Sequence, residues 1–281
     1  MKGSLAFASC VCLLAATAFG QAKPAKESEV TTVRTETKTV SPGVNLTSEL
    51  WGFEDAVPIR ECQVDLRFTT RWDWDGTDGD DDVILQPSVV WGAAENLELS
   101  ANVPLWIGDG GHRGQYQDGN YDTYLGVLWR VREQEDWRPA MALSGTVRIP
   151  TGEGSEGIDA EARLVFTNDY DSGLRSHLNV WGKTANGDND GDDTRDFQYG
   201  GVAGFDGPLC SDGAVRWVAD YEYRSSPVNG GGGEHLAEAG WEWVITDTHK
   251  VGMSVTASLD HAQEYVPEAT VSMVWAITLR Q

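Results

Sequence analysis

The sequence predicts an all-β protein, a single antiparallel transmembrane β-barrel of about twelve strands with short periplasmic turns and longer acidic outer loops. Three observations predict it. Polar and apolar residues alternate with a period of two from Cys62 to near the C-terminus, which is typical of strands with one apolar face. The alternating segments are ten to thirteen residues long, whereas soluble strands usually have ~5–6 residues and tilted membrane strands ~9–11. The connections between the segments alternate between short and long.

The N-terminal residues predict export. Lys2 precedes an apolar run from Leu5 to Phe19, and the small residues that follow suit cleavage. This is the layout of a secretory signal peptide, which we expect to cover residues 1–20, so that the mature chain starts near Gln21. A transmembrane anchor is the alternative, but the run is shorter than the ~20 residues that a spanning helix needs.

Residues 21–60 predict a periplasmic lead-in that is largely disordered. The stretch 22–40 is rich in Lys, Glu, Thr and Val and low in complexity, a composition that buries too little apolar surface to fold alone. A short strand packed on the barrel mouth is the alternative. The barrel itself is expected to occupy residues 61–281.

The overall charge and the lack of long apolar runs exclude several classes of protein. The net charge is −23, and so acidic a chain repels nucleic acid. No stretch after the signal peptide reaches ~18 apolar residues, so membrane-spanning helices are not expected. The chain is nevertheless rich in Trp, with 12, and in Gly, with 32. An acidic, aromatic and Gly-rich chain of this kind suits a barrel in the bacterial outer membrane.

The alternating pattern defines the expected strands. They cover residues 62–73, 83–92, 96–107, 121–132, 138–149, 158–168, 174–184, 196–206, 213–224, 234–246, 249–260 and 267–279. The short connections include 93–95, 169–173 and 246–248, and the long ones are 74–82, 108–120, 150–157, 185–195 and 225–233. Short turns at one end and long loops at the other are typical of a bacterial barrel. Because proline cannot donate to a strand ladder, Pro87 and Pro104 each predict a bulge or a strand end.

The aromatic residues indicate that the apolar face points outward. The polar face carries charges of both signs, whereas the apolar face ends in Trp72, Trp91, Trp129, Trp217, Tyr221, Tyr223, Trp241 and Trp243. Aromatic girdles at both ends of an apolar band are typical of membrane barrels. A soluble periplasmic ligand-binding β-barrel would show the same alternation, but it explains neither the aromatic placement nor the asymmetry of the connections.

Three short motifs resemble a known family. The segment Asp122–Arg132 is similar to the G-D-x-x-L-G-x-K-Y-R strand of the outer-membrane proteins of the phenol-degradation (MetA) pathway family, which are described as transporters. The turn at Pro150–Gly152 matches the one after that family's next strand, and Gly240–Gly252 is similar to its last hairpins. The resemblance implies an outer-membrane barrel that passes or binds small molecules, hydrophobic or aromatic ones among them.

The charged residues of the polar face are the candidate lining of the lumen. They are Arg67, Arg71, Arg130, Arg148, Glu161, Arg163, Arg175, His177, Arg216, Asp220, Glu222, Glu238 and Glu242. Positive side chains dominate the fourth to seventh expected strands and carboxylates gather on the tenth, so opposed charge strips would orient dipolar solutes. The alternative is that these groups pair with one another and plug the interior.

Acidic loops predict a negatively charged rim at the outer mouth. Its residues are Asp78, Asp80, Asp81, Asp82, Asp190, Asp192 and Asp193. Such a rim concentrates cations within a Debye length of ~8 Å, which predicts weak cation selectivity. The two acidic loops, residues 75–82 and 188–193, resemble calcium loops in composition. Neither has the closing Glu of an EF-hand, so we expect at most loosely held divalent cations.

The sequence contains no recognisable catalytic or cofactor motif. Ser225–Ser226 and His235 come nearest to a hydrolase triad, but they flank Gly230–Gly233 and are more simply a flexible loop. No phosphate loop, dinucleotide-binding glycines or zinc spacing is present. Cys62 and Cys210 remain after cleavage, and whether they pair is open.

These observations predict a non-enzymatic outer-membrane pore or transporter that needs no cofactor. Its expected partners are outer-membrane lipid and a small-molecule solute. A structural or surface-interaction barrel with a plugged lumen is the first alternative. A soluble periplasmic ligand-binding barrel is the second.

Overall fold

The computed structural model of the 281-residue chain describes residues 52–74, 82–107, 122–152, 155, 157–185, 195–226, 229–260 and 268–279. All of these residues belong to Val44–Gln281, one of two compact units of the chain. The expected signal peptide, residues 1–20, and the lead-in up to residue 51 lie outside the described residues. Export and a lead-in over residues 21–51 therefore stay predictions.

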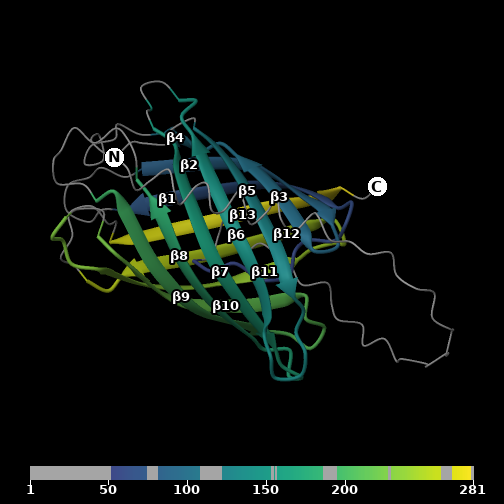
Figure 1. Ribbon diagram of the computed structural model, residues 1–281. Coiled ribbons are helices and arrows are strands. Elements are labelled where there is room, and N and C mark those ends of the chain that lie inside the picture. Colours follow the sequence, from purple (N-terminus) through teal and green to yellow (C-terminus); the bar gives the residue numbers. More distant parts are fainter. Residues whose placement is uncertain are drawn as a thin grey trace. The chain divides into compact units, whose positions relative to one another are not determined.

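Antiparallel strands form a closed barrel, shown in Figure 1. The strands are β1 (Val64–Trp74), β2 (Asp82–Ala94), β3 (Leu97–Asn102), β4 (Leu105–Ile107), β5 (Thr123–Arg132), β6 (Ala140–Ile149), β7 (Asp159–Asp169), β8 (Arg175–Thr184), β9 (Phe197–Pro208), β10 (Val215–Arg224), β11 (Glu234–Val244), β12 (His249–Ser258) and β13 (Ala269–Leu279). The barrel closes because β1 pairs with both β2 and β13. The predicted fold class is confirmed. None of the described residues belongs to a helix long and apolar enough to cross a membrane.

β3 and β4 occupy one position in the wall, which makes the barrel twelve-stranded. Both pair with β2, and the break between them falls at Val103 and Pro104. Pro87 of β2 lies opposite this break, where its carbonyl accepts a hydrogen bond from Val103 N at 3.3 Å. Proline has no N–H to contribute to a ladder, so the two prolines account for the interruption that the sequence predicts.

Most connections at one end of the barrel are shorter than those at the other end, as expected. Short connections lie at 95–96, 133–139, 170–174, 209–214 and 245–248, at what we term the short-connection end. The opposite, long-connection end carries connections at 75–81, 108–122, 150–158, 185–196, 225–233 and 259–268. Gly173 has a φ of 79°, a backbone region that strains residues with a Cβ. The tight turn between β7 and β8 therefore needs its glycine.

The two faces of the wall have the polarity that the sequence predicts. In β1 the exposed fraction is 47 % for Phe68 but 1 % for Arg67, its neighbour. Trp72 and Trp91, expected at the ends of the apolar face, are likewise exposed on the outside of the barrel. The apolar side chains therefore point outward, and the charged side chains point into the barrel.

The residues before β1 lie inside the barrel, which differs from the expected boundary at residue 61. Gly52–Arg60, which we term the inner segment, buries Phe53, Ala56 and Ile59. The segment has no period of two, so its sequence resembles the lead-in and not a strand. It is buried because side chains of the wall supply the partners that its backbone would otherwise find in a sheet, as described below.

Candidate functional site

The residues expected to line the lumen all lie on the inward face. The register carries this face from strand to strand: Arg67 is opposite Ser88 on β2, and Asp220 of β10 is opposite Glu238 of β11. The predicted lumen residues of β7, Glu161 and Arg163, have the same parity as the buried Thr167. Whether they line a conducting passage stays a prediction.

Wall side chains hold the backbone of the inner segment. Asn179 of β8 accepts a hydrogen bond from Glu54 N and donates one to Glu54 O at 3.1 Å. Ala56 N donates to Thr167 Oγ1 at 3.0 Å, and Ile59 N donates to Glu98 Oε2 at 2.9 Å. Buried backbone groups must find such partners, and here side chains of three strands provide them.

Apolar contacts attach the inner segment to two parts of the wall. Phe53 packs in a cluster with residues of β9, β10 and β13, namely Val202, Val218, Val274 and Ala276. Ala56 packs in a second cluster with residues of β5, β6 and β7, namely Leu128, Ala140, Ala142 and Val165. Because these clusters come from different sets of strands, the inner segment bridges the interior instead of lying along one strand.

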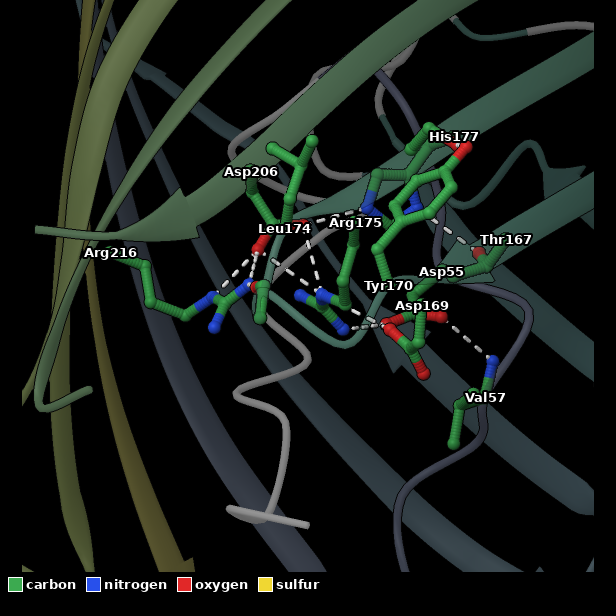
Figure 2. A network of polar contacts seen from close by, with 12 residues as sticks. Asp55, Val57, Thr167, Asp169, Tyr170, Leu174, Arg175, His177, Asp206 and Arg216 are labelled. Carbon is green, nitrogen blue, oxygen red and sulfur yellow. Dashed lines mark hydrogen bonds and ion pairs between the residues drawn. The ribbon is translucent and has the colours of Figure 1, made fainter. Parts of the chain in front are cut away.

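A charged network fixes the middle of the inner segment, as Figure 2 shows. Asp206 of β9 accepts hydrogen bonds from Arg175 Nε at 3.0 Å and from Arg216 Nε at 2.6 Å, and it lies 2.7 Å from His177 Nε2. Arg175 also pairs with Asp55 of the inner segment. The buried carboxylates Asp55 and Asp206 are thus each partnered by arginine, which is what burial of a charge requires. The half-exposed Asp169 lies 4.0 Å from Arg175 Nε at the edge of the network.

Phe53 completes this attachment. Its ring stacks on the imidazole of His177, with 4.2 Å between the ring centroids and 16° between the planes. The other nitrogen, His177 Nδ1, lies 3.1 Å from Thr167 Oγ1. His177 thus has a partner on each nitrogen and an aromatic ring on its face, so it positions the inner segment.

A second charged cluster ties together the long-connection ends of β5, β6 and β7. Arg148 donates to Asp122 Oδ2 at 2.8 Å and to Asp159 Oδ2 at 2.9 Å. Asp122 also accepts hydrogen bonds from Ser155 Oγ at 2.7 Å and from Gly152 N at 2.9 Å. Burial by itself would raise the pKa of Asp122, but these hydrogen bonds and the Arg148 charge hold it below its usual value.

Most of the charged residues expected to line the lumen pair in this way, but two carboxyl groups among them do not. Arg71 pairs with Asp73 at 2.8 Å, and Arg163 pairs with Glu161 at 2.9 Å. Asp220 and Glu238 face one another across β10 and β11, and Asp220 Oδ2 and Glu238 Oε1 have no hydrogen-bond partner. The pairing that the sequence left as an alternative therefore holds for much of the interior and fails at this point.

Several expectations fall outside the described residues or find no geometry to support them. The rim residues Asp78, Asp80, Asp81, Asp190, Asp192 and Asp193 are not described, and Asp82 begins β2. Ser225 Oγ accepts a hydrogen bond from Tyr199 N, while His235 pairs with Tyr221 and Asp260. The nucleophile and base that a triad needs are thus directed to other partners.

Two cysteines lie among the described residues. Cys62 and Cys210 are free thiols, so the structure has no disulfide between them. Among the described residues, no group of three or more His, Cys, Asp or Glu side chains is arranged to hold a metal ion. The acidic loops at 75–81 and 186–194 lie outside that statement.

Sequence reasoning missed the residues that position the inner segment. Asp55, Asp122 and Asp206 are absent from the candidate lining, although each forms buried ion pairs. A signal existed for Asn179 and Asp206, because both have inward parity on expected strands. No local signal marked Phe53 or Asp55, since their partners lie more than a hundred residues away in the chain.

Two solved structures share this fold. An outer membrane channel from Pseudomonas putida F1 matches with a TM-score of 0.59 and 11% sequence identity, over 80% of this chain and 98% of that one. The NanC porin matches with a TM-score of 0.54 and 10% identity, over 77% of this chain and all of that one. No protein-family model and no curated protein matches the sequence. Likeness at these identities shows the fold, so the family suggested by the motifs stays a prediction.

Proposed function

We propose that the chain is a bacterial outer-membrane β-barrel that passes small solutes through a lumen narrowed by the inner segment. The observation that carries this proposal is the polarity of the wall. Large apolar side chains such as Phe68, Leu178 and Val255 are about half exposed on the outside, whereas Arg67 and Glu242 are buried inside. A barrel dissolved in water has the opposite arrangement.

Lipid is the environment that this outer surface fits. Apolar surface is favourable in a bilayer core and costly in water, at roughly 25 cal/mol for each Å². The exposed aromatic residues Trp72, Trp129 and Trp243 lie near strand ends, where membrane barrels carry their aromatic girdles. The soluble periplasmic barrel explains neither feature. We also propose that the N-terminal signal peptide directs export of the chain.

The solutes are proposed to be small, and hydrophobic or aromatic ones are included because the motif resemblance implies them. The inner segment lies inside a twelve-stranded wall, whose lumen is intermediate between a filled small barrel and an open porin. The function needs no catalysis and no cofactor. The undescribed acidic loops are proposed to hold divalent cations loosely at the outer mouth.

Three measurements test the proposal. Cell fractionation should recover the protein with the outer membrane, and the folded barrel should migrate differently on a gel before and after boiling. Purified protein in a planar bilayer should then produce conductance steps. Recovery in the soluble periplasmic fraction would overturn the membrane assignment, whereas membrane recovery without conductance or solute uptake would overturn the channel assignment alone.

One observation favours a second candidate, a structural barrel with a closed lumen. The inner segment is buried at both Phe53 and Ala56 and contacts strands on two parts of the wall. A variant lacking residues 52–60 separates the two candidates. If that variant conducts strongly and the intact chain never does, in any solution condition, then the closed structural barrel is the better description.

A further inference from the structure

The Gly52 end of the inner segment lies on two carboxyl groups that lack a cationic partner. Asp220 and Glu238 are directly opposite one another on β10 and β11 and are 9% and 7% exposed. Gly52 N donates a hydrogen bond to Glu238 Oε2 at 3.3 Å. A Cβ on Gly52 would lie 3.3 Å from Asp220 Oδ1 and 3.5 Å from Val202. The absence of a side chain therefore lets the backbone cover both carboxyl groups closely.

The elements around this pair supply no balancing charge among the described residues. The residue opposite Asp220 on β9 is Gly204, and the residue opposite Glu238 on β12 is Thr256. The hydroxyls of Ser254 and Thr256 lie beside Glu238 but carry no charge, and by hydrogen-bond geometry Asp220 Oδ2 and Glu238 Oε1 are left without a partner. A buried acceptor without a donor is costly, and here two such acceptors belong to adjacent acids.

The charged groups nearby are already engaged or are themselves acidic. On β10, Arg216 pairs with Asp206, and Arg224 pairs with Glu222 and Glu234. Arg163 of β7 donates a hydrogen bond to Gly52 O at 3.1 Å and forms an ion pair with Glu161. Glu222 of β10 is a third acidic group on this side, since a Cβ on Gly52 would lie 3.6 Å from Glu222 Oε2. The remaining charged groups are Glu242 of β11, Glu54 and Asp55 of the inner segment, and Lys250 of β12, which lies toward the short-connection end.

Like charges in this arrangement repel. Carboxylates directly opposite one another on paired strands are destabilising, and removal from water strengthens the repulsion. Two adjacent carboxyl groups relieve it by holding one proton between them, so that a single negative charge remains. That charge still accepts the hydrogen bond from Gly52 N. When the proton leaves, the second charge can be tolerated only if water reaches the pair.

We propose that the Asp220–Glu238 pair is a proton-operated latch for the inner segment. With one proton shared, Gly52 and Phe53 cover the pair and the latch is closed. After the proton is lost, hydration of the pair displaces the Gly52 end. The contact is therefore favoured at low pH and is lost as the pH rises. If the proposed function holds, opening the latch widens the passage. The latch itself depends only on the folded chain.

Amide hydrogen exchange tests the latch without relying on conductance. The full chain is studied in detergent micelles, and rates are corrected for the intrinsic effect of pH. Between about pH 6 and about pH 9, protection of the Gly52 and Glu54 amides should fall by about tenfold or more. Protection of Ala56, whose amide donates to the neutral Thr167 hydroxyl, should change much less. Equal protection of Gly52 at both pH values overturns the latch.

Conservative variants decide whether this pair is responsible. Asp220→Asn and Glu238→Gln each leave one carboxyl group, so each variant should keep Gly52 protected at both pH values. Asp73→Asn is the matched control, because Asp73 is also buried and inward but pairs with Arg71. It should keep the full pH response. A response that survives in both pair variants overturns the proposal, and the two variants together guard against misfolding of either one.

Conductance is measured separately on the same proteins. If protection falls with pH while no current flows at any pH, the latch stands and the channel function fails. If current flows but Gly52 protection is independent of pH, the channel stands and the latch fails.

Discussion

In its middle the inner segment is held where buried carboxylates meet arginines, whereas at Gly52 it lies on carboxyl groups that meet no cation. Asp55 meets Arg175, which also pairs with Asp206, and Arg216 completes the set. At the other position, Asp220 and Glu238 face one another without a cationic partner. Glu238 accepts a hydrogen bond from the Gly52 amide and lies beside the neutral hydroxyls of Ser254 and Thr256. A balanced network keeps its contacts over a wide pH range, and an unbalanced pair makes its contact conditional on a proton.

Breaking the balanced network should have the largest effect on stability. Asp206→Asn removes the shared anion of Arg175, Arg216 and His177, and an uncompensated buried cation costs about 3–5 kcal/mol. The free energy of unfolding, measured by urea titration in lipid vesicles with tryptophan fluorescence, should fall by that amount. Asp136→Asn, at an exposed turn, is the control and should change it by less than about 0.5 kcal/mol. Similar losses in both variants would mean that the network does not stabilise the barrel.

Adding a charge on either side of the wall should distinguish the two faces. Leu178 is 49% exposed on the outside, so Leu178→Arg near the bilayer midplane should cost about 2–4 kcal/mol. Thr256 is inward and opposite Glu238, so Thr256→Arg would give the unbalanced pair a cation and should cost less than about 1 kcal/mol. It should also abolish the pH response of Gly52. A larger cost at Thr256 than at Leu178 would reverse the assignment of the faces.

Removing a backbone partner of the inner segment should have an intermediate effect. Asn179→Ala leaves Glu54 N and Glu54 O without their side-chain partner, which should cost about 1–3 kcal/mol. Ser176→Ala, a polar deletion on the same strand, should cost less than about 0.5 kcal/mol. Faster exchange of the Glu54 amide in the first variant alone would show that the cost arises at this contact. Asn179→Arg is expected to be costly for the same reason.

The smallest expected effect concerns the acidic rim, which lies mostly outside the described residues. If the pore conducts, neutralising Asp80, Asp81 and Asp82 should reduce cation over anion permeability by about twofold at low salt. The preference should fade at molar salt, where the Debye length is ~3 Å. Reversal potentials across a salt gradient measure this ratio. An anion-selective pore would contradict the rim, and an unchanged ratio would move the selectivity to the lumen.

The alternating pattern was enough to predict the wall. Each residue such as Phe68 or Arg67 takes the opposite face from its neighbour because of strand geometry alone. Strand number, the sense of the faces, the two sets of connections and the proline interruption all follow from such local rules, and the structure confirms them. The charged side chains of the strands point inward for the same reason, and their role in lining a passage stays a prediction.

Charge pairing could not be predicted from the pattern. Arg148 was expected to polarise the lumen, yet Asp122 and Asp159 neutralise it. The pairing depends on which residues come opposite one another across three strands and on a turn at Ser155. Which charges meet therefore depends on the register between neighbouring strands, and the pattern within a single strand does not determine that register.

The sequence by itself determined the barrel, because the period of two is a local property of each strand. Only the tertiary structure decided what fills the barrel. Gly52–Arg60 has no period and no strand partner, and its backbone is satisfied by Asn179 and Thr167, which lie 125 and 111 residues from their partners in the chain. Such contacts exist only after the wall has closed, because closure brings these side chains around one segment.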